Sequence, residues 1–153
     1  RIAEYSRLRT NASVEIICGD SREVKFPKCD AIVTSPPYVG LIDYHEQHRY
    51  AYELLGLPDK REYEIGAASS GVSKKAKQQY ISEIGRVFTN VRKSLTDNGV
   101  AVIVVHDKND LYSDIVEKIG FKPDSAPLVR NVNRRTGRRS SEFFEQILVW
   151  KAA

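Results

Sequence analysis

The most constraining feature of the sequence is a short apolar run that ends at two consecutive prolines. Ala31 to Val33 is typical of a buried strand in an α/β sheet. Pro36 and Pro37 must end that strand, because proline donates no N–H to a ladder and has a fixed φ. Pro36 also favours extended backbone at Ser35. We therefore predict a stiff tip, Ser35-Pro36-Pro37-Tyr38, at the carboxyl end of a strand, where open α/β sheets bind ligands.

The tip carries groups that suit a planar amine. An exocyclic amino group, as on cytosine or adenine, has two hydrogens, which the Ser35 hydroxyl and the Pro36 carbonyl can accept. Tyr38 offers a flat face for stacking and a hydroxyl for anchoring. A proline-ended strand in any α/β protein is the structural alternative for the same residues.

The tip resembles the (Ser/Asp/Asn)-Pro-Pro-(Tyr/Phe) hallmark of the amino-group DNA methyltransferases, and the stretch from Asp43 to Leu57 is also similar to that family. The resemblance implies a Rossmann-like methyltransferase fold, S-adenosylmethionine as methyl donor and DNA as substrate, with a flipped base stacked on Tyr38. It implies catalytic roles for Ser35, Pro36, Pro37 and Tyr38. Serine in the first position is common in cytosine-N4 enzymes, so we expect cytosine N4 as the target, with adenine N6 as the alternative.

Three residues are candidates for cofactor binding. Gly19-Asp20-Ser21 follows a predicted strand over Ser13 to Cys18, and an acidic residue at that position can accept from an adenine amino group. The family has a matching acidic residue near the adenine of S-adenosylmethionine. We therefore assign Asp20, Ser21 and Thr34, which precedes the tip, to the cofactor. A simple turn capped by Asp20 or Ser21 explains the first two equally well.

The remaining pattern predicts one α/β domain over residues 1–153, with a mostly parallel sheet and a C-terminal antiparallel hairpin. Apolar residues at three- and four-residue spacings from Lys77 to Leu95 predict the strongest helix, and Pro58 to Lys75 predicts a long loop. We expect further helices at Ile2 to Leu8, Asp43 to Leu55 and Leu111 to Ile119, and further strands at Val100 to Val105, Phe121 to Val129 and Glu145 to Trp150.

The most basic stretch of the sequence is residues 130–139, which we call the basic arm. The chain has 24 lysines and arginines against 20 acidic residues, so its net charge of +4 permits a nucleic-acid partner. Arginines on a hairpin arm suit contacts with phosphates. A solvated loop is the alternative. We assign DNA contacts to Arg130, Arg134, Arg135, Arg138 and Arg139.

One family feature has no counterpart in the sequence. The family's (Phe/Asp)-x-Gly-x-Gly segment closes on the methionine end of S-adenosylmethionine, and the nine glycines of this chain do not cluster in that way. The family's first two strands also have no candidate. We therefore expect a partial methyltransferase fold with its first strands missing. Its partner would be a missing N-terminal segment, a complementary subunit or a second copy.

Two other functions fit part of the pattern. An RNA methyltransferase acting on a guanine amino group uses a related Pro-Pro-Tyr loop, usually with an acidic first residue, which Ser35 is not. A non-catalytic remnant that binds nucleic acid or a partner would explain the absent glycine loop. His45 and His48 lack a third metal ligand, so we expect no metal site. No signal peptide or membrane-length apolar run is present, so we expect a cytoplasmic protein that is not membrane-bound.

Overall fold

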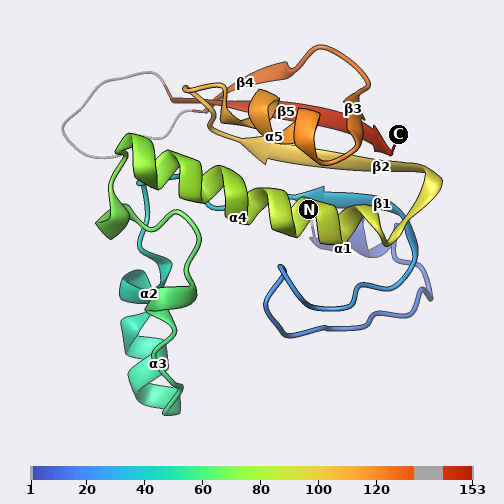
Figure 1. Cartoon of the computed structure of the whole chain (residues 1–153). Coiled ribbons are helices and arrows are strands. Elements are labelled where there is room, and N and C mark those ends of the chain that lie inside the picture. Colours follow the sequence, from blue (N-terminus) through green and yellow to red (C-terminus); the bar gives the residue numbers. More distant parts are fainter. Residues whose placement is uncertain (1, 133–142, 153) are drawn as a thin grey trace.

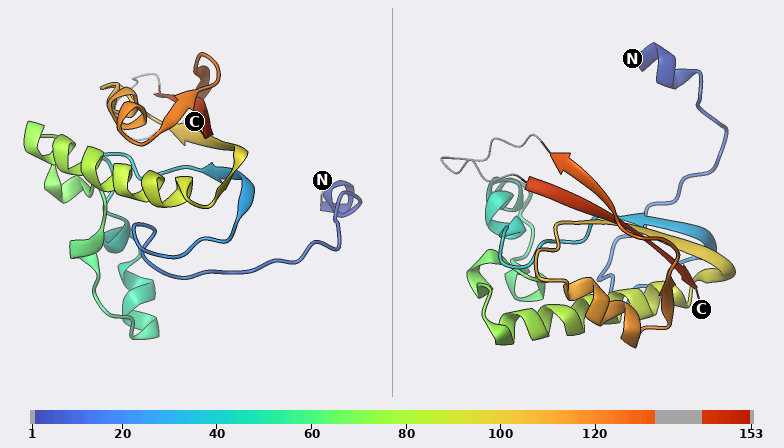
Figure 2. Two further views of the ribbon diagram at one scale, coloured as in Figure 1. Left: turned by 45° about the vertical axis from the view of Figure 1, so that its right-hand side comes forward. Right: turned by 90° about the horizontal axis from the view of Figure 1, so that it is seen from above.

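The structure, a computed structural model, describes residues 2–132 and 143–152. Its centre is a five-stranded sheet with the helices α4 (Lys74–Arg92) and α5 (Leu111–Lys118) packed on one face (Figures 1 and 2). The strands are β1 (Cys29–Thr34), β2 (Leu95–Val105), β3 (Phe121–Pro123), β4 (Leu128–Val132) and β5 (Phe143–Ala152). The predicted α/β class is confirmed.

The strand order is β1-β2-β5-β3, and β4 also pairs with β5. Strands β1 and β2 are parallel, because α4 carries the chain back across the sheet between them. Strands β2, β3 and β4 all pair with β5 in antiparallel fashion, as the predicted terminal hairpin requires. Among the described strands only one pairing is parallel, so this part of the sheet is mainly antiparallel and not mostly parallel as expected.

The core lies between α4, α5 and the covered face of the sheet. Helix α4 buries Tyr80, Ile84, Phe88 and Val91, which confirms the predicted apolar face. Along β2, every second residue from Ala101 to Val105 is buried, as expected for a strand with one face in the core. Ser73 caps the N-terminus of α4, because its side chain accepts a hydrogen bond from the Ala76 N–H at 3.2 Å. The tip therefore sits on a sheet that is firmly packed beneath it.

The predicted strand over residues 13–18 is wrong. Val14 and Ile16 are 87% and 91% exposed, and the segment has no strand assignment. A strand needs a neighbour that pairs its backbone groups, and no described strand lies beside these residues. Figure 2 shows the N-terminal segment, with α1 (Ile2–Ser6), extending away from the sheet.

The expected helix from Asp43 to Leu55 is divided into α2 (Tyr44–Gln47) and α3 (Arg49–Leu55). Gly56 ends α3 with a φ of 60°, a conformation that glycine adopts without a steric penalty. Two short 3-10 turns, Arg61–Tyr63 and Ala68–Ser70, interrupt the predicted loop. None of the described helices is both long enough and apolar enough to cross a membrane.

Candidate active site

The tip begins where β1 ends at Thr34, which is the predicted position. Thr34 pairs with Ile103, so β2 continues to Val105 and places His106 beside the tip. The Tyr38 and His106 rings are 6.0 Å apart. Pro36 is buried, whereas Ser35 is exposed to solvent. The carboxyl ends of the two parallel strands therefore meet at the tip, which is the edge of a parallel sheet that binds ligands.

A buried pair of tyrosines holds the backbone of the tip. The Tyr80 hydroxyl, on α4, donates to the Pro37 carbonyl oxygen at 2.8 Å, and the Tyr112 hydroxyl, on α5, lies 2.9 Å from that of Tyr80. Burial raises the pKa of both tyrosines, so both stay neutral and can donate. Gly66 passes so close that an added Cβ would lie 2.8 Å from the Tyr80 ring. This close packing fixes the hydroxyl that holds Pro37.

The Tyr38 side chain is held by a residue of β5. Its hydroxyl donates to Glu145 Oε1 at 2.8 Å, and Glu145 is buried on β5. The other carboxylate oxygen of Glu145 accepts a hydrogen bond from Arg130, which is its direct neighbour on β4. Arg130, which we assigned to DNA, is therefore in an ion pair, although its side chain remains 59% exposed.

Aromatic rings surround Tyr38 at the ends of β2 and β5. His106 stacks on Phe143 with ring centroids 4.1 Å apart, and its Nδ1 donates to the Phe144 carbonyl oxygen at 2.6 Å. The Tyr38 and Phe143 rings lie 6.3 Å apart at 43°. Our reading of the sequence assigned no role to these rings or to Glu145. A glutamate within the apolar stretch of β5 was the signal that could have revealed it.

The residues assigned to the cofactor lie close to the tip. Asp20 and Ser21 line a cavity of about 630 Å³ together with Pro37. Ser21 and Pro37 also line a second, mainly apolar cavity of about 470 Å³ between β1 and α4, which includes Thr34 and Ser35. The structure therefore brings all three assigned residues to two adjoining cavities beside the tip.

Asp20 also has a local structural role. It accepts hydrogen bonds from the Arg22 backbone N–H at 2.9 Å and from the Arg22 guanidinium at 2.6 Å. These bonds lower the pKa of the Asp20 carboxyl, which is therefore ionised at neutral pH. The turn interpretation of Gly19-Asp20-Ser21 is thus observed. An ionised carboxylate at the rim of a cavity can still accept from an amino group.

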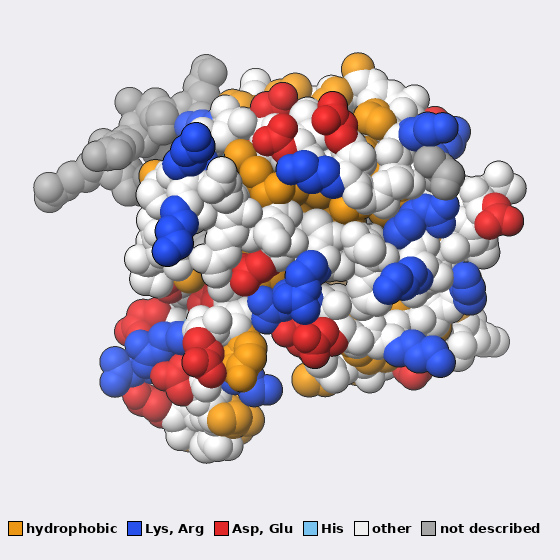
Figure 3. Space-filling model, viewed as in Figure 1, with side chains coloured by type: hydrophobic (Ala, Val, Ile, Leu, Met, Phe, Trp, Pro, Cys, Tyr) orange, Lys and Arg blue, Asp and Glu red, His pale blue; other side chains and the backbone are white. Residues whose placement is uncertain are grey.

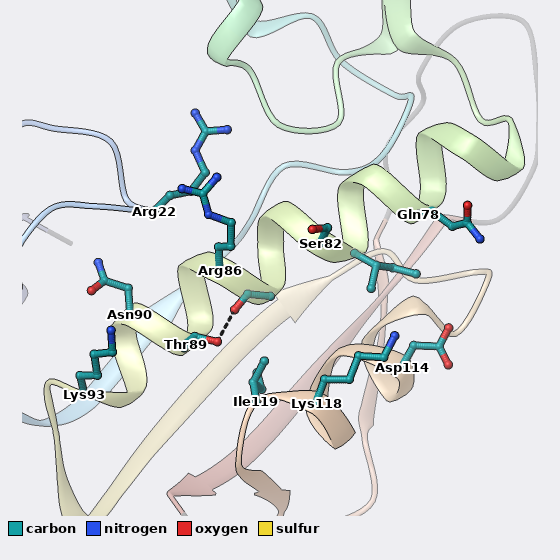
Figure 4. A pocket seen from close by; sticks show the side chains of 12 residues that line it. Arg22, Gln78, Ser82, Arg86, Thr89, Asn90, Lys93, Asp114, Lys118 and Ile119 are labelled. Carbon is teal, nitrogen blue, oxygen red and sulfur yellow. Dashed lines mark hydrogen bonds between the residues drawn. The ribbon is translucent and has the colours of Figure 1, made fainter.

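A separate groove of about 720 Å³ runs along the outer side of α4 (Figure 4). Arg22, Arg86, Lys93 and Lys118 line it, and Figure 3 shows lysine and arginine side chains interspersed with acidic ones on this face. Arg86 lies 3.4 Å from Glu23, and Arg22 is paired with Asp20, so much of this charge is balanced. The groove does not include the tip. Arg134, Arg135, Arg138 and Arg139 of the basic arm lie outside the described residues.

His45 has a structural environment. It is buried and its ring lies 4.0 Å from that of Tyr52, with Nε2 3.3 Å from Asp59 Oδ1. That distance allows an ionic contact, but the geometry is not that of a hydrogen bond. In the part of the chain that the structure describes, no group of three or more His, Cys, Asp or Glu side chains could hold a metal ion.

The sequence of the chain is similar to that of a methyltransferase. No protein-family model matches the sequence. The type II methyltransferase M.MjaII of Methanocaldococcus jannaschii is 42% identical over 171 residues, covering 99% of this chain and 31% of M.MjaII. The chain is homologous to a segment of a methyltransferase. This confirms the resemblance to the amino-group DNA methyltransferases that the tip indicated.

Solved structures show the same methyltransferase fold. A protein of Thermus thermophilus described as a DNA modification methylase aligns with a TM-score of 0.51 and 23% identity, over 87% of this chain and 51% of that one. The cytosine-N4-specific PvuII DNA methyltransferase aligns with a TM-score of 0.52 and 12% identity, over 88% and 48%. The Thermus protein has also been solved in complex with S-adenosyl-L-methionine. The chain thus spans about a third of M.MjaII and about half of each solved chain.

Proposed function

We propose that this chain is the base-binding part of a DNA methyltransferase catalytic domain that methylates an exocyclic amine, with cytosine N4 as the target. The observation that carries the proposal is the tip, which stands at the carboxyl end of β1 with Pro37 and Tyr38 both hydrogen-bonded to buried residues. The similarity to M.MjaII supports methyl transfer. Serine at position 35 and the likeness in fold to a cytosine-N4 enzyme support the choice of base.

S-adenosylmethionine would supply an electrophilic methyl group. Asp20, Ser21 and Thr34 would hold it, because they line the adjoining cavities and Asp20 presents an ionised acceptor for an adenine amino group. The mainly apolar cavity between β1 and α4 suits the less polar parts of such a molecule. The residues present therefore fit one side of the cofactor.

The residues of the tip orient the base for attack. The Ser35 hydroxyl and the Pro36 carbonyl accept the two amino hydrogens, which directs the nitrogen lone pair toward the methyl carbon. The half-buried Tyr38 ring keeps one part accessible for stacking on a flipped base. The nitrogen gains the methyl group and loses one proton to water. No covalent intermediate with the protein forms, so catalysis consists of positioning and electrostatic stabilisation.

The basic arm would hold the DNA backbone. Arg134, Arg135, Arg138 and Arg139 would contact phosphates, since they lie in the sequence between β4 and β5, and Phe143 at the start of β5 has its ring 6.3 Å from that of Tyr38. Arg130 stays in this set, because its side chain is largely exposed while it contacts Glu145.

A partner would complete the domain at β1. The edge of β1 opposite β2 has no neighbour among the described strands, and Val33 on this strand is 76% exposed. Open strand edges are rarely left unprotected. We propose that the rest of a methyltransferase domain adds here, from a further segment, a complementary subunit or a second copy.

A methyl-transfer assay tests the proposal. The chain, together with its completing partner, would be incubated with radiolabelled S-adenosylmethionine and matched DNA or RNA duplexes, and the methylated nucleoside would be identified by mass spectrometry. We expect N4-methylcytosine in DNA. N6-methyladenine would change the base, N2-methylguanine in RNA would favour the RNA enzyme, and binding of DNA without transfer would favour a non-catalytic role.

A further inference from the structure

Glu145 is a buried carboxylate in an otherwise mainly apolar strand. It is 6% exposed, and β5 continues with Ile147 and Leu148. Burying an ionised carboxylate is unfavourable unless it is paired and hydrogen-bonded. The Tyr38 hydroxyl and the Arg130 guanidinium supply those partners, one to each carboxylate oxygen. One of the groups that bind Glu145 therefore belongs to the tip.

The hydroxyl bond ties the Tyr38 ring to a charged acceptor. The neighbouring rings of His106 and Phe143 lie 6.0 and 6.3 Å away by their centroids, and both are tilted relative to Tyr38. Tilted rings at such distances pack favourably against the Tyr38 ring but form no hydrogen bond with it. A short hydrogen bond to a charged acceptor fixes the far end of the side chain in direction and distance.

We propose that Glu145 is a positioning residue that orients the ring of Tyr38 for base stacking, and that Arg130 balances the charge of Glu145. The consequence for methyl transfer rests on the function proposed above. The Tyr38 hydroxyl is then committed to the protein and is not an anchor for the substrate. The β4–β5 hairpin, which leads into the basic arm, is thereby joined to the tip by a continuous set of polar contacts.

The first test measures the position of Tyr38 and needs no activity. The chain would be labelled with tyrosine carrying ¹³C at the ring carbon that bears the hydroxyl, and the Tyr38 signal identified by its loss in Tyr38→Phe. We expect Glu145→Gln to shift the Tyr38 signal and leave the signals of Tyr80 and Tyr112 in place. An unchanged Tyr38 signal would overturn the proposal.

The second test measures turnover of the completed methyltransferase. A hydrogen bond to a charged group contributes enough free energy that its loss in Glu145→Gln should lower kcat about tenfold or more. The KM for DNA should change less than about twofold. Since Glu145 acts through the Tyr38 hydroxyl, adding Glu145→Gln to Tyr38→Phe should cost less than about twofold more. Independent, multiplying losses in the double variant would contradict the inference.

A matched control removes an ion pair made by another residue of β5. Asp124→Asn removes the ion pair between Asp124 and Lys151 of β5, which are 2.6 Å apart and do not touch the tip. It should leave both kcat and the Tyr38 signal unchanged, and a loss equal to that of Glu145→Gln would count against a specific role.

If Glu145→Gln fails to fold, Tyr38→Phe must show the same loss of turnover with the Glu145–Arg130 pair retained. If the unsubstituted protein methylates nothing, the proposed function fails, while the labelled-tyrosine result still decides the position of Tyr38.

Discussion

The Tyr80 hydroxyl lies 2.8 Å from the carbonyl oxygen of Pro37, 43 residues away in the sequence, and joins α4 to the tip. This bond ties the backbone of the substrate-binding segment to a side chain that is 2% exposed. A substitution in the core can therefore disturb the tip without any change to the residues of the tip itself.

Tyr80→Phe should lower both stability and turnover. It leaves the Pro37 carbonyl without this donor and removes the partner of the Tyr112 hydroxyl, and unmade buried hydrogen bonds cost about 1–3 kcal/mol each. Thermal denaturation and kcat measure the two effects. Tyr50→Phe, at a 70% exposed position, is the control and should change neither. Equal stability of the Tyr80 and Tyr50 variants would show that the bond contributes nothing.

Ser35→Ala should lower kcat more than it weakens DNA binding. The hydroxyl orients the amino group during transfer, whereas the affinity for DNA comes mainly from other contacts. Because Ser35 is exposed, the change should leave the melting temperature unaltered. Ser125→Ala, between β3 and β4, is the matched control. A variant with normal kcat would remove Ser35 from the catalytic set.

Tyr38→Ala should be the most damaging change at the tip. It removes the stacking face, and base–aromatic stacking is worth about 1–3 kcal/mol per base. It also removes a donor to the buried Glu145, so a loss of stability should accompany the loss of activity. Steady-state kinetics and thermal denaturation would be compared with those of Tyr38→Phe, which keeps the ring. Near-normal methylation by Tyr38→Ala would reduce the tip to a strand terminator.

The chain alone should bind S-adenosylmethionine weakly or not at all. The described cavities provide contacts for one side of the molecule, and the sequence has no glycine-rich segment for its methionine end. Titration calorimetry measures this directly. Asp20→Asn should weaken any residual binding further. Tight, stoichiometric binding by the chain would contradict the expectation.

Replacement of Arg134, Arg135, Arg138 and Arg139 by alanine should weaken DNA binding and reduce its salt dependence. The slope of log K against log salt is negative, and each lost phosphate contact should reduce its magnitude by about 0.9. Lys118→Ala with Lys122→Ala, in α5 and β3, removes charge elsewhere and should leave the slope nearly unchanged. An unaltered slope in the arginine variant would show that the basic arm does not contact phosphates.

Val33→Lys should prevent association at β1 without unfolding the chain. Val33 is exposed on the strand whose outer edge has no neighbour among the described strands. A lysine there is tolerated by solvent but opposes the addition of another strand. Light scattering at increasing concentration, with and without the rest of a methyltransferase domain, measures the effect. An unsubstituted chain that stays monomeric and takes up no partner would contradict this use of the edge.

The position of the tip could be predicted because its causes are local. An apolar run and two prolines suffice to end a strand, whatever surrounds them. The helical face of α4 was equally predictable from its spacing. Residues 13–18 have the composition of a strand, but strand formation depends on a neighbour that the local sequence does not specify. Tyr80 lies on that apolar face, yet its hydrogen bond to Pro37 depends on how α4 crosses the sheet.

The contacts that hold the tip come from distant parts of the chain. Tyr38 and Glu145 are separated by 107 residues, so the partner of Tyr38 is synthesised long after Tyr38 itself. Contacts of such high sequence separation form slowly, because a long loop must close before they are gained. On the ribosome, β1, α4 and β2 can pack before β5 has emerged. The substrate-binding residues would then take their final arrangement only after β5 has left the ribosome, so a nascent chain that ends before β5 would carry no ordered tip.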